Sequence, residues 1–170
     1  MIYKKGSGNE NLTSADVCEE ALCFGWIDSV PNKVDEFKFK LLVSPRKPNS
    51  VWSALNKRRV AKLIAEKQMT EAGLRKIEIA KKNGMWTQLE SSDRLEFPKL
   101  LAQGLKANRK ASNFFESIAP SSKRAILGWI GLAKTEETKL KRIKETIRLA
   151  AQGIRANHYQ DLKKLKAKRR

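Results

Sequence analysis

The sequence predicts an α+β fold that is predominantly helical, with a short N-terminal sheet of two or three strands, packed helices, and then a C-terminal helical bundle. Two observations support this class. Apolar and charged residues alternate, with the period of a half-buried strand, only within the first 45 residues. From residue 54 onward apolar residues recur at helical spacing, and a residue suited to capping begins most of these runs.

The N-terminal elements follow from local patterns. MIYKK at residues 1–5 is typical of the end of a strand, and a GSGN turn follows it. Residues 12–25 predict a helix that Thr13 or Ser14 caps, and Trp26-Ile27-Asp28 is expected to be an ordered loop. VDEFKFKLLVSP at 34–45 places Phe37, Phe39 and Leu41 on alternate positions, which predicts one continuous strand.

Helical periodicity then continues almost to the end of the chain. Ser53, Thr70 and Thr135 are expected N-caps, and Ser121 or Ser122 is expected to cap the helix that follows Pro120. In the first of these helices Val60, Leu63 and Ile64 share one apolar face. The predicted helices are 54–67, 71–83, 98–107, 109–118, 121–134 and 136–152.

Residues 87–97 are polar and loop-like, which divides the chain. We expect an α+β region over 1–90 and a helical region over 98–153 packed on it. The remaining 154–170 form a basic tail with too little apolar content to pack, so fraying is expected there.

The chain is strongly basic, with a net charge of +18. Residues 1–99 hold 18 Lys and Arg against 13 Asp and Glu, and residues 100–170 hold 18 against 5. Such a field favours polyanions as partners. The second hypothesis of function is therefore non-specific nucleic-acid binding through the last helix and the tail, by Lys141, Lys144, Arg148, Lys163, Lys164, Lys166, Lys168, Arg169 and Arg170.

Several classes of site and location are disfavoured. The single histidine, His158, argues against a histidine-based zinc site or a Ser-His-Asp triad. Cys18 and Cys23 lack metal-ligand spacing and predict buried, reduced thiols. No metal or cofactor is expected. No apolar run has membrane-spanning length and the N-terminus is unlike a signal peptide, so a cytoplasmic location is predicted.

The stretch SPRKPNSVWSALNKRR at 44–59 is the strongest candidate site. Pro45 and Pro48 stiffen the approach to the helix, whose N-terminus, together with Arg46, Lys47, Lys57 and Arg58, could hold a phosphate or carboxylate. The alternative is structural, with Trp52 as a core anchor and the charges solvated.

Asp28 is the carboxylate with the best claim to a special role. It could act as a general base, or it could pair with Arg46 as a structural ion pair, and the structural role is favoured. An enzymatic function resting on Asp28 and Ser53 is the weakest hypothesis, because neither residue has an activating partner visible in the sequence.

Four segments together resemble the bacterial YdeI/OmpD-associated family of bacteriocin-protection proteins: ALCFGWIDS at 21–29, SPRKPNSVWSALNK at 44–57, MTEAGLRKIEIAKKNGMW at 69–86 and SSKRAILGWIGLAKTEETKLKRI at 121–143. The resemblance spans residues 2–153. Family members usually begin some tens of residues earlier, so the chain is expected to be N-terminally shortened. Lys139 stands where the family tends to have arginine.

The resemblance implies a small, mostly helical α+β protein of the stress response, non-enzymatic and linked to tolerance of bacteriocins or cationic antimicrobial peptides. The family name includes a porin, but a cytoplasmic, cationic chain argues against that direct partner. The first hypothesis is a cleft that binds an anionic small ligand or peptide. Its candidate residues are Trp26, Asp28, Arg46, Trp52, Ser53, Asn56, Lys57 and Trp86.

Overall fold

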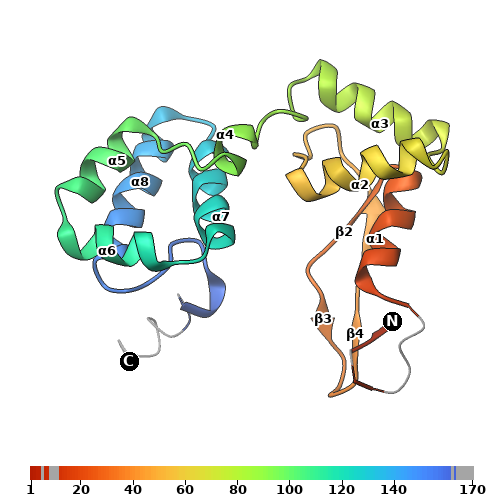
Figure 1. Ribbon diagram of the computed structural model, residues 1–170, viewed down its shortest axis with the longest axis horizontal. Helices are drawn as coiled ribbons and strands as arrows, with labels where there is room; N and C mark the ends of the chain where they lie inside the picture. The colour runs from red at the N-terminus through yellow and green to blue at the C-terminus, as the bar shows by residue number, and fades with distance from the viewer. Residues whose placement is uncertain (5, 8–11, 162, 164–170) are drawn as a thin grey trace. The chain divides into compact units, whose positions relative to one another are not determined.

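The computed structural model describes residues 1–4, 6, 7, 12–161 and 163, and the chain divides into two compact units (Figure 1). Unit 1 is Met1–Thr87 and unit 2 is Gln88–Arg170. Among the described residues, the strands all lie in unit 1, whereas unit 2 is built from helices. The predicted α+β, predominantly helical class is therefore confirmed.

Among its described residues, unit 1 contains two small antiparallel sheets. In the first, β4 (Lys38–Lys40) lies between β1 (Ile2–Tyr3) and β3 (Asn32–Lys33), with Phe39 opposite Ile2 on one side and Lys33 on the other. In the second, β2 (Trp26–Asp28) pairs with β5 (Val43–Pro45).

Two predictions about these strands were wrong. Residues 26–28 form strand β2, because they pair with β5 across the chain, and a three-residue segment carries no alternation of its own. The continuous strand expected over 34–45 is two strands in different sheets, interrupted at residues 41 and 42. At the start of β4 the Asp35 carboxylate accepts hydrogen bonds from the backbone N–H groups of Phe37 and Lys38, which leaves Phe37 in an exposed turn.

Three helices complete unit 1, and each has the N-cap that the sequence predicts. These helices are α1 (Ser14–Cys23), α2 (Ala54–Ala65) and α3 (Glu71–Lys82), capped by Thr13, Ser53 and Thr70. Their shared core consists of Leu22, Cys23, Trp52, Val60, Leu63, Ile77 and Ala80. The sequence predicts that Ile64 is buried together with Val60 and Leu63. In the structure Val60 and Leu63 are buried, whereas Ile64 is exposed.

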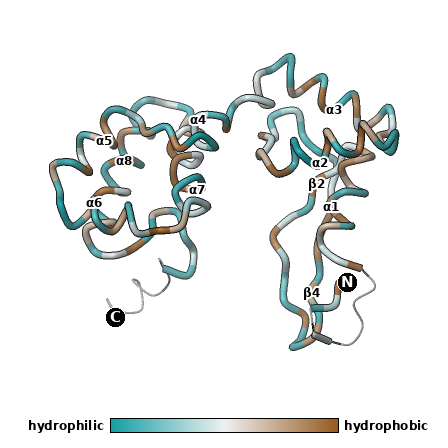
Figure 2. The backbone as a smooth tube through the Cα atoms, viewed as in Figure 1, coloured by the Kyte–Doolittle hydropathy of each residue, from teal (hydrophilic) through white to brown (hydrophobic). Residues whose placement is uncertain are grey.

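Unit 2 is a helical bundle. Helices α5 (Lys99–Lys106), α6 (Arg109–Ser117) and α7 (Pro120–Gly131) each pack against α8 (Glu136–Ala150), which Thr135 caps as predicted. Figure 2 shows hydrophobic and hydrophilic segments alternating along these helices. The buried core is apolar and includes Leu101, Phe115, Ile130, Ile143 and Leu149.

Three features of unit 2 differ from expectation. The polar segment 87–97 contains a short helix, α4 (Glu90–Asp93), which packs on α7. The N-cap of α7 is Ala119, with Pro120 in the first turn, so neither Ser121 nor Ser122 caps it. Within the segment 154–170, which is expected to fray, Ala156 is buried in the core and Arg155 pairs with Asp161. Residues 162 and 164–170 lie outside the described residues.

Candidate functional site

Arg46 directly follows β5 and is buried inside unit 1. Its backbone N–H donates to the carbonyl of Gly25, a glycine held at φ +73°. The guanidinium carbon lies 3.8 Å from the centroid of the Trp52 ring, and Nη1 donates a 2.9 Å hydrogen bond to the Val51 carbonyl. Only 2% of the residue is exposed. The local cause is the stiff Pro45 and Pro48 segment, which folds the chain back over the side chain.

The charge of Arg46 has no ion-pair partner within the described part of the chain. Nε and Nη2 are buried and neither makes a hydrogen bond there. Burial lowers the pKa of Arg46 from its usual 12.5 to about 10, and the nearby Asp28 opposes this only in part. The side chain thus stays protonated at neutral pH, as a buried cation whose remaining N–H groups lack acceptors, which is an unfavourable state.

A polar cluster from three elements lies beside Arg46. Cys18 on α1 donates through its thiol to Asp28 Oδ1 on β2, with 3.5 Å between sulfur and oxygen. Arg59 Nη1 on α2 lies 3.2 Å from both Cys18 Sγ and Asn56 Oδ1. At the outer edge, Glu19 contacts Arg59 and the exposed Lys62. Burial raises the pKa of the Cys18 thiol and Asp28 raises it further, so the thiol is protonated and a poor nucleophile at neutral pH.

The structure brings several of the predicted site residues together. Asp28 and Asn56 belong to this cluster, and Trp52 stacks on Arg46. The Trp86 ring lies 5.1 Å from that of Trp52, and Lys57 lies over Trp86.

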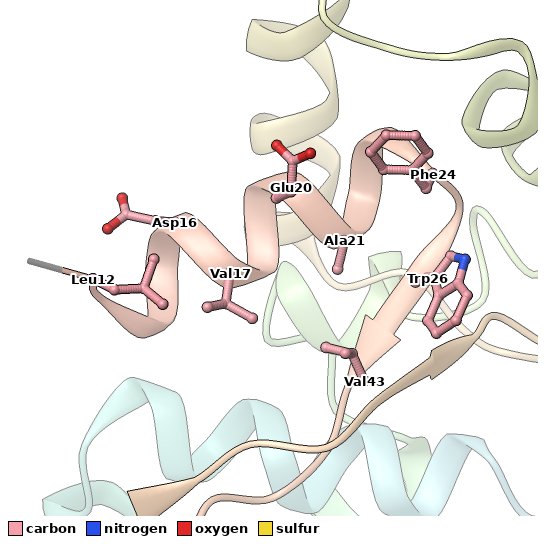
Figure 3. A pocket seen from close by; sticks show the side chains of 8 residues that line it. All are labelled: Leu12, Asp16, Val17, Glu20, Ala21, Phe24, Trp26 and Val43. Atoms are coloured by element: carbon pink, nitrogen blue, oxygen red, sulfur yellow. The ribbon is translucent and has the colours of Figure 1, made fainter. Parts of the chain in front are cut away.

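Three of the candidate residues have other contacts than the predicted cleft suggests. The ion pair expected between Asp28 and Arg46 does not form, and Asp28 Oδ1 accepts a hydrogen bond from the Cys18 thiol. Ser53 Oγ is occupied as the cap of α2, accepting from the backbone of Asn56. Trp26 lies outside the cluster, half exposed in a separate groove (Figure 3).

Sequence reasoning missed Cys18, Arg59 and Glu19 as members of the cluster. Asn56 and Arg59 are three positions apart and therefore share a face of α2, which was the available signal. No pattern in the sequence indicates that Cys18, on another element, would meet that face. Both cysteines are free and buried, as predicted.

The residues of the nucleic-acid hypothesis divide into three groups. Lys141 and Lys144 lie exposed on α8, and Lys163 is also exposed. Arg148 is engaged with Glu145 through two hydrogen bonds of 2.9 and 2.7 Å, so its charge is locally balanced. Lys164, Lys166, Lys168, Arg169 and Arg170 lie outside the described residues.

The described residues contain no group of three His, Cys, Asp or Glu side chains arranged to hold a metal ion. No helix among them is long and apolar enough to cross a membrane.

The fold and site define a two-unit α+β protein whose N-terminal unit encloses a buried cation and whose C-terminal unit is an apolar helical bundle. Residues 94–153 match the family described as "Bacteriocin-protection, YdeI or OmpD-Associated", which confirms the resemblance for that segment. Residues 1–76 match a different family model, a domain of unknown function, DUF8412. The motifs at 21–29 and 44–57, which contain Asp28, Arg46 and Trp52, thus fall within that second match. No curated protein and no solved structure matches the chain.

Proposed function

We propose that unit 1 is a non-enzymatic binding module that holds a small anionic ligand on Arg46, and that the chain acts in tolerance to bacteriocins or cationic antimicrobial peptides. The carrying observation is the buried guanidinium whose Nε and Nη2 have no acceptor among the described residues. The tolerance role is supported by the family description matched by residues 94–153.

The geometry of the free groups indicates the ligand class. Nε and Nη2 share one edge of the planar guanidinium, and this edge fits two oxygens of a carboxylate or phosphate. The third nitrogen, Nη1, donates a hydrogen bond to the Val51 carbonyl, which fixes the orientation of the guanidinium. Stacking on Trp52 fixes the plane as well. The edge therefore suits a bidentate anion better than a neutral ligand.

We expect access to Arg46 through movement of the exposed segment 47–49, which leaves Val51 and Trp52 in place. Lys47, Pro48 and Asn49 are exposed, and the segment is held to α3 by a hydrogen bond from Asn83 Nδ2 to the Pro48 carbonyl. Such an exposed connection with few contacts opens at a low free-energy cost. The ligand therefore enters as this segment lifts from the unit.

Thermal unfolding in a series of small carboxylates and phosphates tests the proposal. An anion that binds the folded state raises the unfolding temperature. Arg46→Met should abolish the rise, whereas Arg75→Met, which removes the same charge from an exposed position on α3, should retain it. Circular dichroism confirms that both variants fold.

The Asp28→Asn variant provides a second test of the anion site, in which Arg46 is kept. Asp28 places a negative charge near the guanidinium, so its neutralisation should strengthen anion binding several-fold. If no anion in the series stabilises the wild-type protein, or if Arg46→Met responds as the wild type does, the anion site is wrong. The tolerance role is tested separately, by the peptide sensitivity of cells that carry only the Arg46→Met chain.

Non-specific nucleic-acid binding by unit 2 is the second candidate, favoured by the exposed lysines Lys141 and Lys144 on α8. Its affinity for RNA or DNA should fall linearly with the logarithm of salt concentration, and the double substitution Lys141→Ala/Lys144→Ala should reduce that slope by roughly 2. Salt-independent binding would rule this function out.

A further inference from the structure

A concave surface in unit 1 shares no residue with the buried Arg46 site. It is an open groove of about 680 Å³ between α1 and the β2–β5 sheet. Figure 3 shows Val17 and Ala21 on the side of α1 that faces Val43 of β5. The apolar lining consists of Leu12, Val17, Ala21, Phe24, Trp26 and Val43.

The largest of these side chains remain exposed. Leu12, Phe24 and Trp26 expose 46%, 48% and 40% of their surface. A contiguous group of large apolar side chains around a hollow is unusual on a protein surface, and it marks a place where another apolar surface gains free energy by docking.

The charge around the groove is opposite to that of the chain. Helix α1 carries Asp16, Glu19 and Glu20 and no basic residue, in a sequence with twice as many Lys and Arg as Asp and Glu. Asp16 and Glu20 are the charged residues that line the groove, whereas Glu19 is engaged with Arg59 and Lys62. Hydrogen bonds from Thr13 lower the pKa of Asp16, which keeps it ionised at neutral pH.

We propose that this groove docks a basic amphipathic helix of a partner polypeptide. The apolar face of that helix would cover Phe24 and Trp26, and its Lys or Arg side chains would pair with Asp16 and Glu20. Because these two carboxylates lie four positions apart on α1, they match two basic residues at the same spacing on the partner. The docking does not rest on the anion site at Arg46.

Charge complementarity selects this occupant over two others. An anionic lipid surface would be repelled by the carboxylates at the rim of the groove. A second copy of the chain docked face to face would place the Asp16 and Glu20 carboxylates of one groove against those of the other, which opposes self-association through this groove.

The test measures the binding of a fluorescein-labelled amphipathic Leu/Lys peptide to the full chain by anisotropy, beside a Leu/Glu peptide with the same apolar face. The Lys peptide should bind roughly tenfold more tightly, a difference of about 1.4 kcal/mol. Glu20→Lys should weaken its binding about fivefold, because an attraction becomes a repulsion. Glu78→Lys makes the same charge change on the exposed face of α3, outside the groove, and should weaken binding less than about twofold.

A third variant, Phe24→Ser, tests the apolar contribution at an exposed position and should also weaken binding about fivefold or more. Equal weakening by Glu20→Lys and Glu78→Lys would assign the effect to overall charge and overturn the proposal. Equal affinity for the two peptides, or no binding, would do the same. A dimer in sedimentation that Phe24→Ser dissociates would place a second copy in the groove instead.

Discussion

The two units differ in whether their buried polar groups have hydrogen-bond partners. In unit 2, the buried hydroxyls of Ser92 and Thr146 each donate a 2.8 Å hydrogen bond to a backbone carbonyl. In unit 1, the buried Arg46 keeps two nitrogens without a partner and Trp52 keeps its indole N–H, and all such atoms found among the described residues lie in this unit. Unit 2 is therefore a satisfied apolar scaffold, whereas unit 1 retains donors that an added ligand can satisfy.

The largest expected effect is a core truncation in unit 2. Phe115 is buried and packs edge-on against Phe97 with ring centroids 5.6 Å apart. Phe115→Ala should lower the free energy of unfolding by about 3–5 kcal/mol, because the lost contacts leave a cavity. Urea denaturation followed by circular dichroism measures the change. A loss below about 1 kcal/mol would mean that this core is not closely packed.

A matched pair of glycine substitutions compares the close contacts in the two units. A Cβ at Gly73 in α3 would lie 2.3 Å from the backbone carbonyl oxygen of Cys23, whereas one at Gly104 in α5 would lie 2.2 Å from the terminal methyl of Ile147. Backbone cannot move aside without separating α3 from α1, but a terminal methyl can rotate away. Gly73→Ala should therefore destabilise by about 2–3 kcal/mol.

Gly104→Ala should cost less than about 1 kcal/mol, because the helix propensity of alanine offsets part of the strain. Both variants are measured by the same urea titration as the Phe115 variant. Equal losses would show that α1 and α3 can move apart as readily as Ile147 can turn.

The smallest effect concerns the charged segment after α8. Arg155 donates to both oxygens of Asp161, at 2.8 and 3.1 Å, which lowers the pKa of that carboxyl below its usual 3.8. A carboxylate whose pKa is depressed on folding stabilises the folded state above its unfolded pKa, and this contribution is lost as the pH falls through the folded pKa. Asp161→Asn should thus cost about 0.5–1 kcal/mol at pH 7.

The difference between Asp161→Asn and the wild type should shrink as the pH falls below about 4, since the carboxyl of the unfolded chain then becomes protonated while that of the folded chain stays ionised to lower pH. Urea titrations at pH 7, 4 and 3 measure it. A difference that stays constant across this range would indicate a packing effect of the substitution and no role for the ion pair.

Local signals in the sequence predicted much of the fold. The caps Thr13, Ser53, Thr70 and Thr135 act on the next turn of the chain, so each could be recognised from its neighbours. Strand β2 could not be recognised from its neighbours in sequence, because it is formed by pairing with β5, which lies further along the chain. A short helix such as α4 is likewise stabilised by its packing on α7 more than by its own residues.

The candidate site was predictable in part for the same reason. Arg46 and Trp52 were recognisable from one continuous stretch, which places them six positions apart. The contact of Cys18 with Arg59 joins residues 41 positions apart, and Asp28 accepts a hydrogen bond from the Cys18 thiol and forms no ion pair with Arg46. Which donor meets a carboxylate depends on three-dimensional distances that spacing along the chain does not encode.

The distribution of the four tryptophans gives the protein a set of intrinsic optical reporters. Trp26 is half exposed in the apolar groove, Trp52 is enclosed against the Arg46 guanidinium, and Trp129 lies in unit 2 beside Arg142. Solvent relaxation shifts the emission of an exposed indole to longer wavelength than that of an enclosed one. Peptide docking should thus change the long-wavelength part of the emission spectrum and anion binding the short-wavelength part, so one titration distinguishes the two events without a label.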